Sequence, residues 1–177
     1  MHHFFRELNS KEHRLFARNN TPQKIQTYLD SLSVNFEIEE NTLQSPRRVM
    51  TSGKAQCFEG ALLGAAMLWY HGYTPMVLDL VTIPGDDSHV VAVFKEGKKW
   101  GALSKTNHAV LRYRDAVYAS PRELAMSYFH EYFLDSGEKK HLSPMQCFRL
   151  ELFQKTGLLI LTTFGILTMH SICKITK

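Results

Sequence analysis

The sequence predicts an α+β fold in which a helix that begins at a cysteine packs on an antiparallel sheet. The helix is indicated by small and apolar residues at helical spacing, namely Cys57, Ala61, Gly64, Ala65 and Leu68. Three apolar runs follow it, at residues 74–83, 89–94 and 100–104, with turn-forming residues between them. A helix followed by a meander of strands is typical of α+β proteins rather than of doubly wound parallel sheets.

Length and composition indicate one globular domain followed by an unusual tail. The chain has 177 residues, of which 44% are hydrophobic and 21% are charged, so it is long enough for a single core. After position 140 there are four basic residues and one acidic residue, whereas the preceding part is nearly neutral. We therefore predict a domain over residues 1–140 and an atypical apolar and basic tail over residues 141–177. Because the excess positive charge lies in the tail, we expect no nucleic-acid partner.

The N-terminal part of the chain predicts two helices. Residues 2–18 carry apolar side chains at loosely helical spacing. Thr21 is placed to cap a second helix over residues 22–32, in which Pro22 takes the first helical position.

An extended segment and a short helix are expected before the cysteine. Residues 34–39 alternate apolar and polar side chains, as a short strand or an extended arm does. Residues 42–50 favour a short helix, and we interpret its basic pair Arg47 and Arg48 as a solvated face rather than a phosphate site.

The second half of the predicted domain contains further strands and a last helix. Residues 96–99 read as a hairpin turn, and residues 110–113 are a candidate fourth strand. Ser120 is placed to cap a helix over residues 121–133.

Cys57 is a candidate nucleophile because it opens a helix. A thiol at a helix N-terminus lies near the positive end of the helix dipole and near backbone N–H groups, and both favour the thiolate. The alternative is a small buried side chain with no chemical role. The backbone N–H of Cys57 could contribute to an oxyanion hole, and Gln56 could add a side-chain donor, unless Gln56 is simply a surface residue.

The cysteine pattern also indicates the cellular compartment and argues against a bound metal. The cysteines at positions 57, 147 and 173 are odd in number and widely separated, which is neither a disulfide framework nor a metal-binding pattern. We therefore predict a reducing, cytoplasmic environment, no metal and no other cofactor.

His89 is the second candidate site residue. A histidine that opens an apolar strand is often solvent-facing or satisfied by local hydrogen bonds. A histidine on a strand beside a cysteine helix, however, is what a thiol nucleophile needs, because the imidazole can take the thiol proton and return it to the leaving group. A third polar group then has to orient the ring.

The order of these features resembles the transglutaminase-like (papain-related) superfamily of cysteine enzymes. In that superfamily the cysteine helix reads roughly Cys-x-x-x-Ala with a later glycine, the next strand begins His-x-x-Val or similar, and a Trp-x-x-Leu-Asp-x-Thr segment carries the third catalytic residue. Here the corresponding features are the helix that starts at Cys57, then Gly72, His89, and residues 100–107, which read Trp-Gly-Ala-Leu-Ser-Lys-Thr-Asn. The resemblance covers residues 40–110 and is closest to uncharacterised bacterial members. It implies a papain/transglutaminase-like core, with Cys57 as nucleophile and His89 as base.

Ser104 stands where the superfamily pattern has aspartate. A serine hydroxyl can accept a hydrogen bond from the ring, but it carries no charge to stabilise an imidazolium. Asn107 is the second candidate for the orienting role, as asparagine is in Cys-His-Asn sites. Both have simpler interpretations, Ser104 as a plain strand residue and Asn107 as part of a turn.

The resemblance implies a thiol hydrolase or acyl transferase that acts on an amide bond of a peptide or protein through a Cys57 thioester. The missing aspartate keeps a second function open, that of a weakly active or inactive binding module. Residues 156–173 are uncharged and long enough to suggest a membrane anchor, but their threonines, glycines and His170 favour a buried segment instead.

Overall fold

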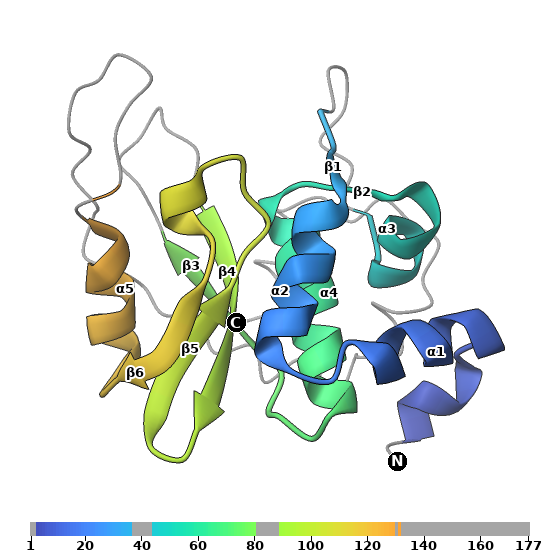
Figure 1. Cartoon of the computed structure of the whole chain (residues 1–177), viewed down its shortest axis with the longest axis horizontal. Coiled ribbons are helices and arrows are strands. Elements are labelled where there is room, and N and C mark those ends of the chain that lie inside the picture. Colours follow the sequence, from blue (N-terminus) through green and yellow to red (C-terminus); the bar gives the residue numbers. More distant parts are fainter. Residues whose placement is uncertain (1–2, 37–43, 81–88, 130, 132–177) are drawn as a thin grey trace, which may run out of the picture.

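The computed structural model describes residues 3–36, 44–80, 89–129 and 131, and the predicted tail lies outside them. A four-stranded antiparallel sheet, in the order β3-β4-β5-β6, stands between two sets of helices. Helices α2 and α4 cover one face of the sheet, and α5 covers part of the other (Figure 1). The predicted α+β class, with the cysteine helix packed on an antiparallel sheet, is therefore confirmed. Within the described residues, every helix is too short or too polar to cross a lipid bilayer.

The N-terminal segment forms two helices where residues 2–18 predict one. A 3₁₀ helix, η1, covers His3–Glu7, and α1 covers Ser10–Arg18. Asn9 separates them because its side chain accepts a hydrogen bond from the backbone N–H of Glu12 at 3.0 Å, and Glu12 accepts one from Asn9 N–H at 2.7 Å. This reciprocal capping box starts a new helix, so the prediction of one continuous helix was wrong.

The next helix begins as predicted. Helix α2 covers Pro22–Ser31, and Thr21 caps it by accepting a hydrogen bond from Lys24 N–H. Its buried side chains include Ile25 and Leu29, which face α4 and the sheet.

A small parallel ribbon joins the end of α2 to the residues before Cys57. Strand β1 (Ser33–Val34) pairs with β2 (Lys54–Ala55), and α3 (Pro46–Ser52) lies between them in sequence. Of the predicted extended segment only the first residue, Val34, lies in a strand, and residues 37–43 are outside the described part.

The interpretation of the basic pair of α3 as a solvated face holds for Arg48 but not for Arg47, which is half-buried. Arg47 donates from Nε to Oε1 of Glu12 at 2.8 Å, so this arginine ties α3 to α1.

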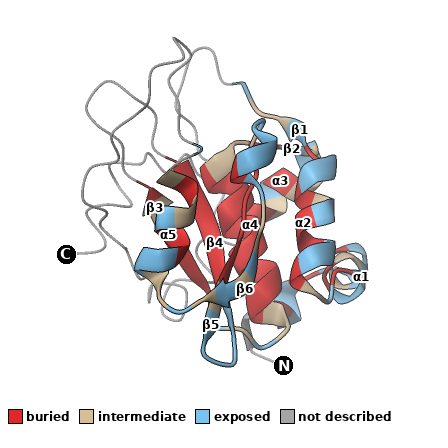
Figure 2. Ribbon diagram, turned by 60° about the vertical axis from the view of Figure 1, so that its left-hand side comes forward, coloured by how far each residue is buried: buried red, intermediate tan, exposed pale blue. Residues whose placement is uncertain are grey.

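Helix α4 (Cys57–Tyr70) is the most buried element, and Figure 2 shows it in the interior beside β4. The sheet that it covers consists of β3 (Met76–Leu80), β4 (His89–Glu96), β5 (Lys99–Leu103) and β6 (Arg114–Tyr118). The helix, the two hairpin strands and the turn between them agree with the sequence predictions.

The fourth strand does not lie where residues 110–113 predict it. That segment overlaps a 3₁₀ turn, η2 (Ala109–Leu111), and the strand β6 follows it. Leu111 is buried under the sheet face that α5 covers, so its apolar character reflects packing rather than strand pairing. The last helix, α5 (Pro121–Phe129), is capped by Ser120 as predicted, through a bond from Glu123 N–H at 3.1 Å.

Two glycines of α4 give a test of how closely the helix approaches the sheet. A Cβ added at Gly60 would lie 2.3 Å from Cβ of Lys105, whereas one added at Gly64 would lie 3.4 Å from its nearest neighbours. We expect Gly60→Ala to lower the free energy of unfolding by about 2 kcal/mol, because a Cβ cannot fit without moving the chain at Lys105. Gly64→Ala should stay within about 1 kcal/mol of the native chain, because alanine favours helix and the contact is near van der Waals distance.

Urea unfolding of both variants measures the difference between them. Equal effects of the two substitutions would contradict the close approach at Gly60.

Candidate functional site

Cys57 occupies the first position of α4, as the sequence predicts. Strand β2 delivers it there, because Ala55 is fully buried and paired in the small ribbon. Gln56 is the N-cap residue of the helix, and its backbone N–H donates to Oε2 of Glu59 at 2.8 Å. The thiol side chain is half-buried, so it is neither sealed in the core nor fully open to solvent.

Cys57 and His89 lie at the same end of the sheet. Gly64 of α4 packs against Ala92 of β4, and the glycine one turn nearer to Cys57 packs against Lys105, beyond the end of β5. Cys57 precedes Gly64 by a distance of roughly 10 Å along the helix, and His89 precedes Ala92 by roughly 10 Å along the strand. In Figure 1 this is the upper end of the sheet, where α4 begins and β5 ends.

His89 and Ser104 contact each other directly. Nε2 of the imidazole and Oγ of the serine are 2.9 Å apart. The His89 side chain is 6% exposed and Ser104 is fully buried. Two of the candidate site residues are thus hydrogen-bonded to each other.

The side chain of His89 starts from the face of the sheet opposite to α4. Val90 and Ala92 belong to the core beneath α4, whereas Val91 belongs to the core beneath α5. His89 is paired with Leu80, which also belongs to the α5 side. Because directly paired residues share a face, the imidazole starts on the side opposite α4. A contact between this ring and the thiol of Cys57 therefore has to be made around the end of the sheet.

The environment of His89 keeps its ring neutral at physiological pH. The pKa of the imidazole is lowered from 6.5 to about 4, chiefly by burial and to a smaller extent by the charge of nearby His108. A hydrogen bond with the backbone of Leu111 acts in the opposite direction and raises the pKa. The hydroxyl of Ser104, which contacts the ring, adds no negative charge that would favour the imidazolium.

Glu59 is a buried site residue that the sequence analysis does not single out. Its carboxylate is fully buried, and it accepts hydrogen bonds from the backbone N–H of Gln44 at 2.7 Å and of Gln56 at 2.8 Å. The side chain of Asn35 donates to it at 3.3 Å. The sequence signal was present, because a glutamate three positions after a helix N-cap is typical of a capping box.

The remaining candidates are less closely associated with His89. Asn107 is exposed, and among the described residues it makes no hydrogen bond with the imidazole. Gln56 is half-buried beside Cys57.

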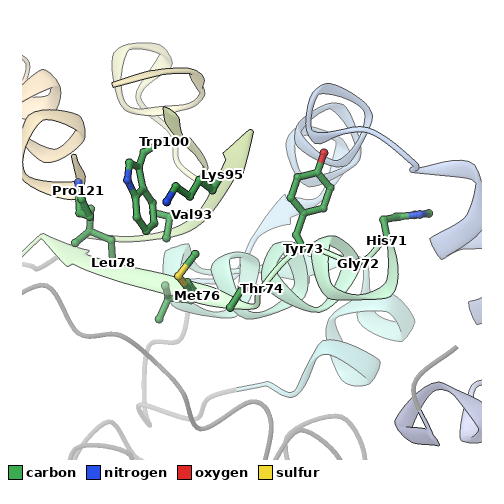
Figure 3. A pocket seen from close by; sticks show the side chains of 11 residues that line it. His71, Gly72, Tyr73, Thr74, Met76, Leu78, Val93, Lys95, Trp100 and Pro121 are labelled. Atoms are coloured by element: carbon green, nitrogen blue, oxygen red, sulfur yellow. The ribbon is translucent and has the colours of Figure 1, made fainter. Parts of the chain in front are cut away.

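A separate pocket lies at the opposite end of the sheet, on the face that α5 covers in part. It has a volume of about 750 Å³, and Figure 3 shows the side chains that line it from β3, β4 and β5. Lys95 lies over the ring of Trp100 there, with Nζ 5.2 Å from the ring centre. None of its lining residues belongs to the Cys57, His89 and Ser104 group.

The depressed pKa of His89 makes stability depend on pH in a defined window. The unfolded chain protonates this ring below about pH 6.5, but the folded chain does so only below about pH 4. The unfolded state therefore binds more protons between these values, and the free energy of unfolding falls as the pH decreases through the window. We expect His89 to contribute about 3 kcal/mol to this fall.

Chemical unfolding of the native chain and of His89→Gln between pH 4 and 7 checks this value. The difference between the two curves should shrink as the pH falls. Parallel curves would contradict the neutral, buried ring.

None of the models of known protein families matches the chain, and no curated protein is significantly similar to it in sequence. The function therefore has to be argued from the site itself.

Proposed function

We propose that the protein is a transglutaminase-like thiol enzyme of the cytoplasm, which hydrolyses or transfers the acyl group of a peptide or protein amide. The observation that carries the proposal is the hydrogen bond between His89 and Ser104, at the end of the sheet where Cys57 opens a buried helix. Nucleophile, base and orienting group would then come from α4, β4 and the end of β5, in the order of the papain/transglutaminase-like core.

In the proposed reaction His89 acts through its second ring nitrogen. In the tautomer that carries its proton on Nε2, the ring donates to Oγ of Ser104, and the lone pair of Nδ1 takes the proton of the Cys57 thiol. The thiolate attacks the amide carbon, and the positive end of the α4 dipole and the side chain of Gln56 stabilise the oxyanion. The imidazolium returns its proton to the departing amine as the carbon–nitrogen bond breaks. Water or a second amine then releases the acyl group from sulfur and restores the thiol.

Because Ser104 carries no charge, formation of the imidazolium is the energetically unfavourable step of the proposed reaction. An aspartate behind the ring would raise its pKa, whereas a hydroxyl leaves the ring at about 4. The proposed enzyme therefore works with a neutral thiol and a neutral imidazole rather than with a preformed ion pair. Its thiol should be less reactive than that of a site with a carboxylate in this position.

The same observation favours a second candidate, a binding module without catalytic activity. A buried serine in place of the aspartate and a ring held neutral are what an inactive descendant of a thiol enzyme would retain. In that case the amide-binding surface persists and Cys57 is dispensable.

Alkylation rates test the thiol–imidazole pair. We expect iodoacetamide at pH 7 to label Cys57 at least about tenfold faster than Cys147 and Cys173 in the same chain, because the helix N-terminus favours its thiolate and His89 can take the thiol proton as sulfur attacks. His89→Ala should remove this advantage, whereas His71→Ala, at the other end of α4, should preserve it. Peptide mapping by mass spectrometry measures each cysteine separately. Equal rates for all three cysteines would argue against the pair.

A carboxylate restored behind the ring tests the role of position 104. We expect Ser104→Asp to raise the pKa of His89 and to increase the rate at which p-nitrophenyl acetate acylates Cys57 by about tenfold or more. Ser104→Ala, which has no hydrogen-bonding group, should lower that rate. The acetyl adduct on Cys57 is read by mass spectrometry. No adduct in any of the three proteins would favour the binding module over the enzyme.

A further inference from the structure

Gln26 is a fully enclosed amide on α2 that contacts the end of β5. Its side chain is 2% exposed. Oε1 accepts a hydrogen bond from the backbone N–H of Ser104 at 2.9 Å, and Nε2 donates to the backbone carbonyl of Ser104 at 2.8 Å. A single side chain thus pairs with both backbone groups of one residue, as a neighbouring strand would.

Among the described residues, no strand pairs with β5 at the position of Ser104 on the side where Gln26 lies. Strand β6 pairs with β5 at Trp100 and Ala102, and the register between them is irregular. Ser104 lies just beyond β5, where its backbone N–H and carbonyl are buried. Buried backbone groups without partners are strongly unfavourable, so Gln26 supplies there the hydrogen bonds that a further strand residue would have supplied.

The side-chain amide of Gln26 also connects, through two further residues, to the segment of η2 that hydrogen-bonds the imidazole. Nε2 of Gln26 also donates to Oδ1 of Asp30 at 2.8 Å, and Asp30 forms an ion pair with Arg112. Arg112 directly follows η2, whose Leu111 hydrogen-bonds the ring of His89 through its backbone.

We propose that Gln26 is a positioning residue, which holds the backbone of Ser104 so that its hydroxyl stays within hydrogen-bond distance of Nε2 of His89. It acts through Ser104 and does not touch the reacting atoms. The catalytic meaning of this role rests on the proposed function, but the effect on the ring does not. Helix α2, which precedes the region that resembles the superfamily, therefore supports the imidazole.

The experiment follows the ring of His89 by NMR in the full chain. Long-range proton–nitrogen spectra report the tautomer and the pKa of each histidine, and the His89→Gln spectrum identifies the His89 signals. Gln26→Met keeps the size of the side chain and removes its hydrogen bonds. We expect it to shift the His89 nitrogen signals and to raise the pKa of the ring toward its ordinary value, because a released Ser104 no longer closes the site to water.

Two controls separate positioning from general loosening. Gln23→Met changes an exposed glutamine of the same helix and should leave the His89 signals in place. His71, whose Nε2 lies 2.8 Å from the carbonyl of Phe16, reports the integrity of the fold and should be unchanged in every variant. Gln26→Glu keeps the acceptor for Ser104 N–H and loses the donor, and it takes the place of Gln26→Met if the latter does not fold.

A double-mutant cycle decides whether Gln26 acts through Ser104. In a Ser104→Ala background the Gln26 substitution should cause little further change at His89, because the hydroxyl that it positions is gone. His89 signals that do not move in the Gln26 variant, or that move equally in both backgrounds, would overturn the proposal. Slow alkylation of Cys57 together with the expected NMR shifts would reject the enzymatic function and leave this inference standing.

Discussion

The close approach of α4 to the sheet is the constraint on which the rest of the structure depends. Gly60 lets the helix lie against Lys105, and Gly64 lets it lie against Ala92 and Leu103. A larger side chain at the first of these contacts would push the helix away. The helix start would then no longer be level with the beginning of β4 and the end of β5. The arrangement of the candidate site therefore depends on how closely the backbone of α4 packs on the sheet.

The polar groups at this end of the sheet are arranged to avoid exposed charge. The buried carboxylate of Glu59 is satisfied by N–H donors, and the ammonium of Lys105 donates to the carbonyl of Leu32 at 2.6 Å. His89 is kept neutral and bonded to a hydroxyl. In this environment a positively charged imidazole is unfavourable.

The sequence predicts those parts of the fold that local patterns determine. The periodicity of α4, the apolar runs of β4 and β5, and the caps at Thr21 and Ser120 are local features, and each of these elements is where it was expected. The break at Asn9 was missed because the loose apolar spacing on both sides hides a capping box. The position of β6 was missed because Leu111 of η2 packs against the sheet instead of pairing within it.

The candidate site likewise contains contacts that the sequence suggests and contacts that it does not. Motif order made Ser104 and Asn107 the two candidates for a contact with His89, and Ser104 is the one that is hydrogen-bonded to it. Gln26 contacts Ser104 across 78 positions of the chain. Helical spacing puts Gln26 on the same side of α2 as Ile25 and Leu29, but no residue near it indicates Ser104 as its partner. Contacts of this kind depend on how α2 packs, which no short window of sequence contains.

Because β1 pairs with β2, the N-terminal residues are part of the same folding unit as the cysteine helix. The stretch that resembles the superfamily starts near residue 40, yet β1, Asn35 and α2 all precede it. A fragment trimmed to the resembling stretch would lose the partner strand of β2, the amide on Ser104 and one donor to Glu59. The part of the chain from Cys57 to Ser104 therefore depends on contacts with the N-terminal residues, and the two form one structural unit.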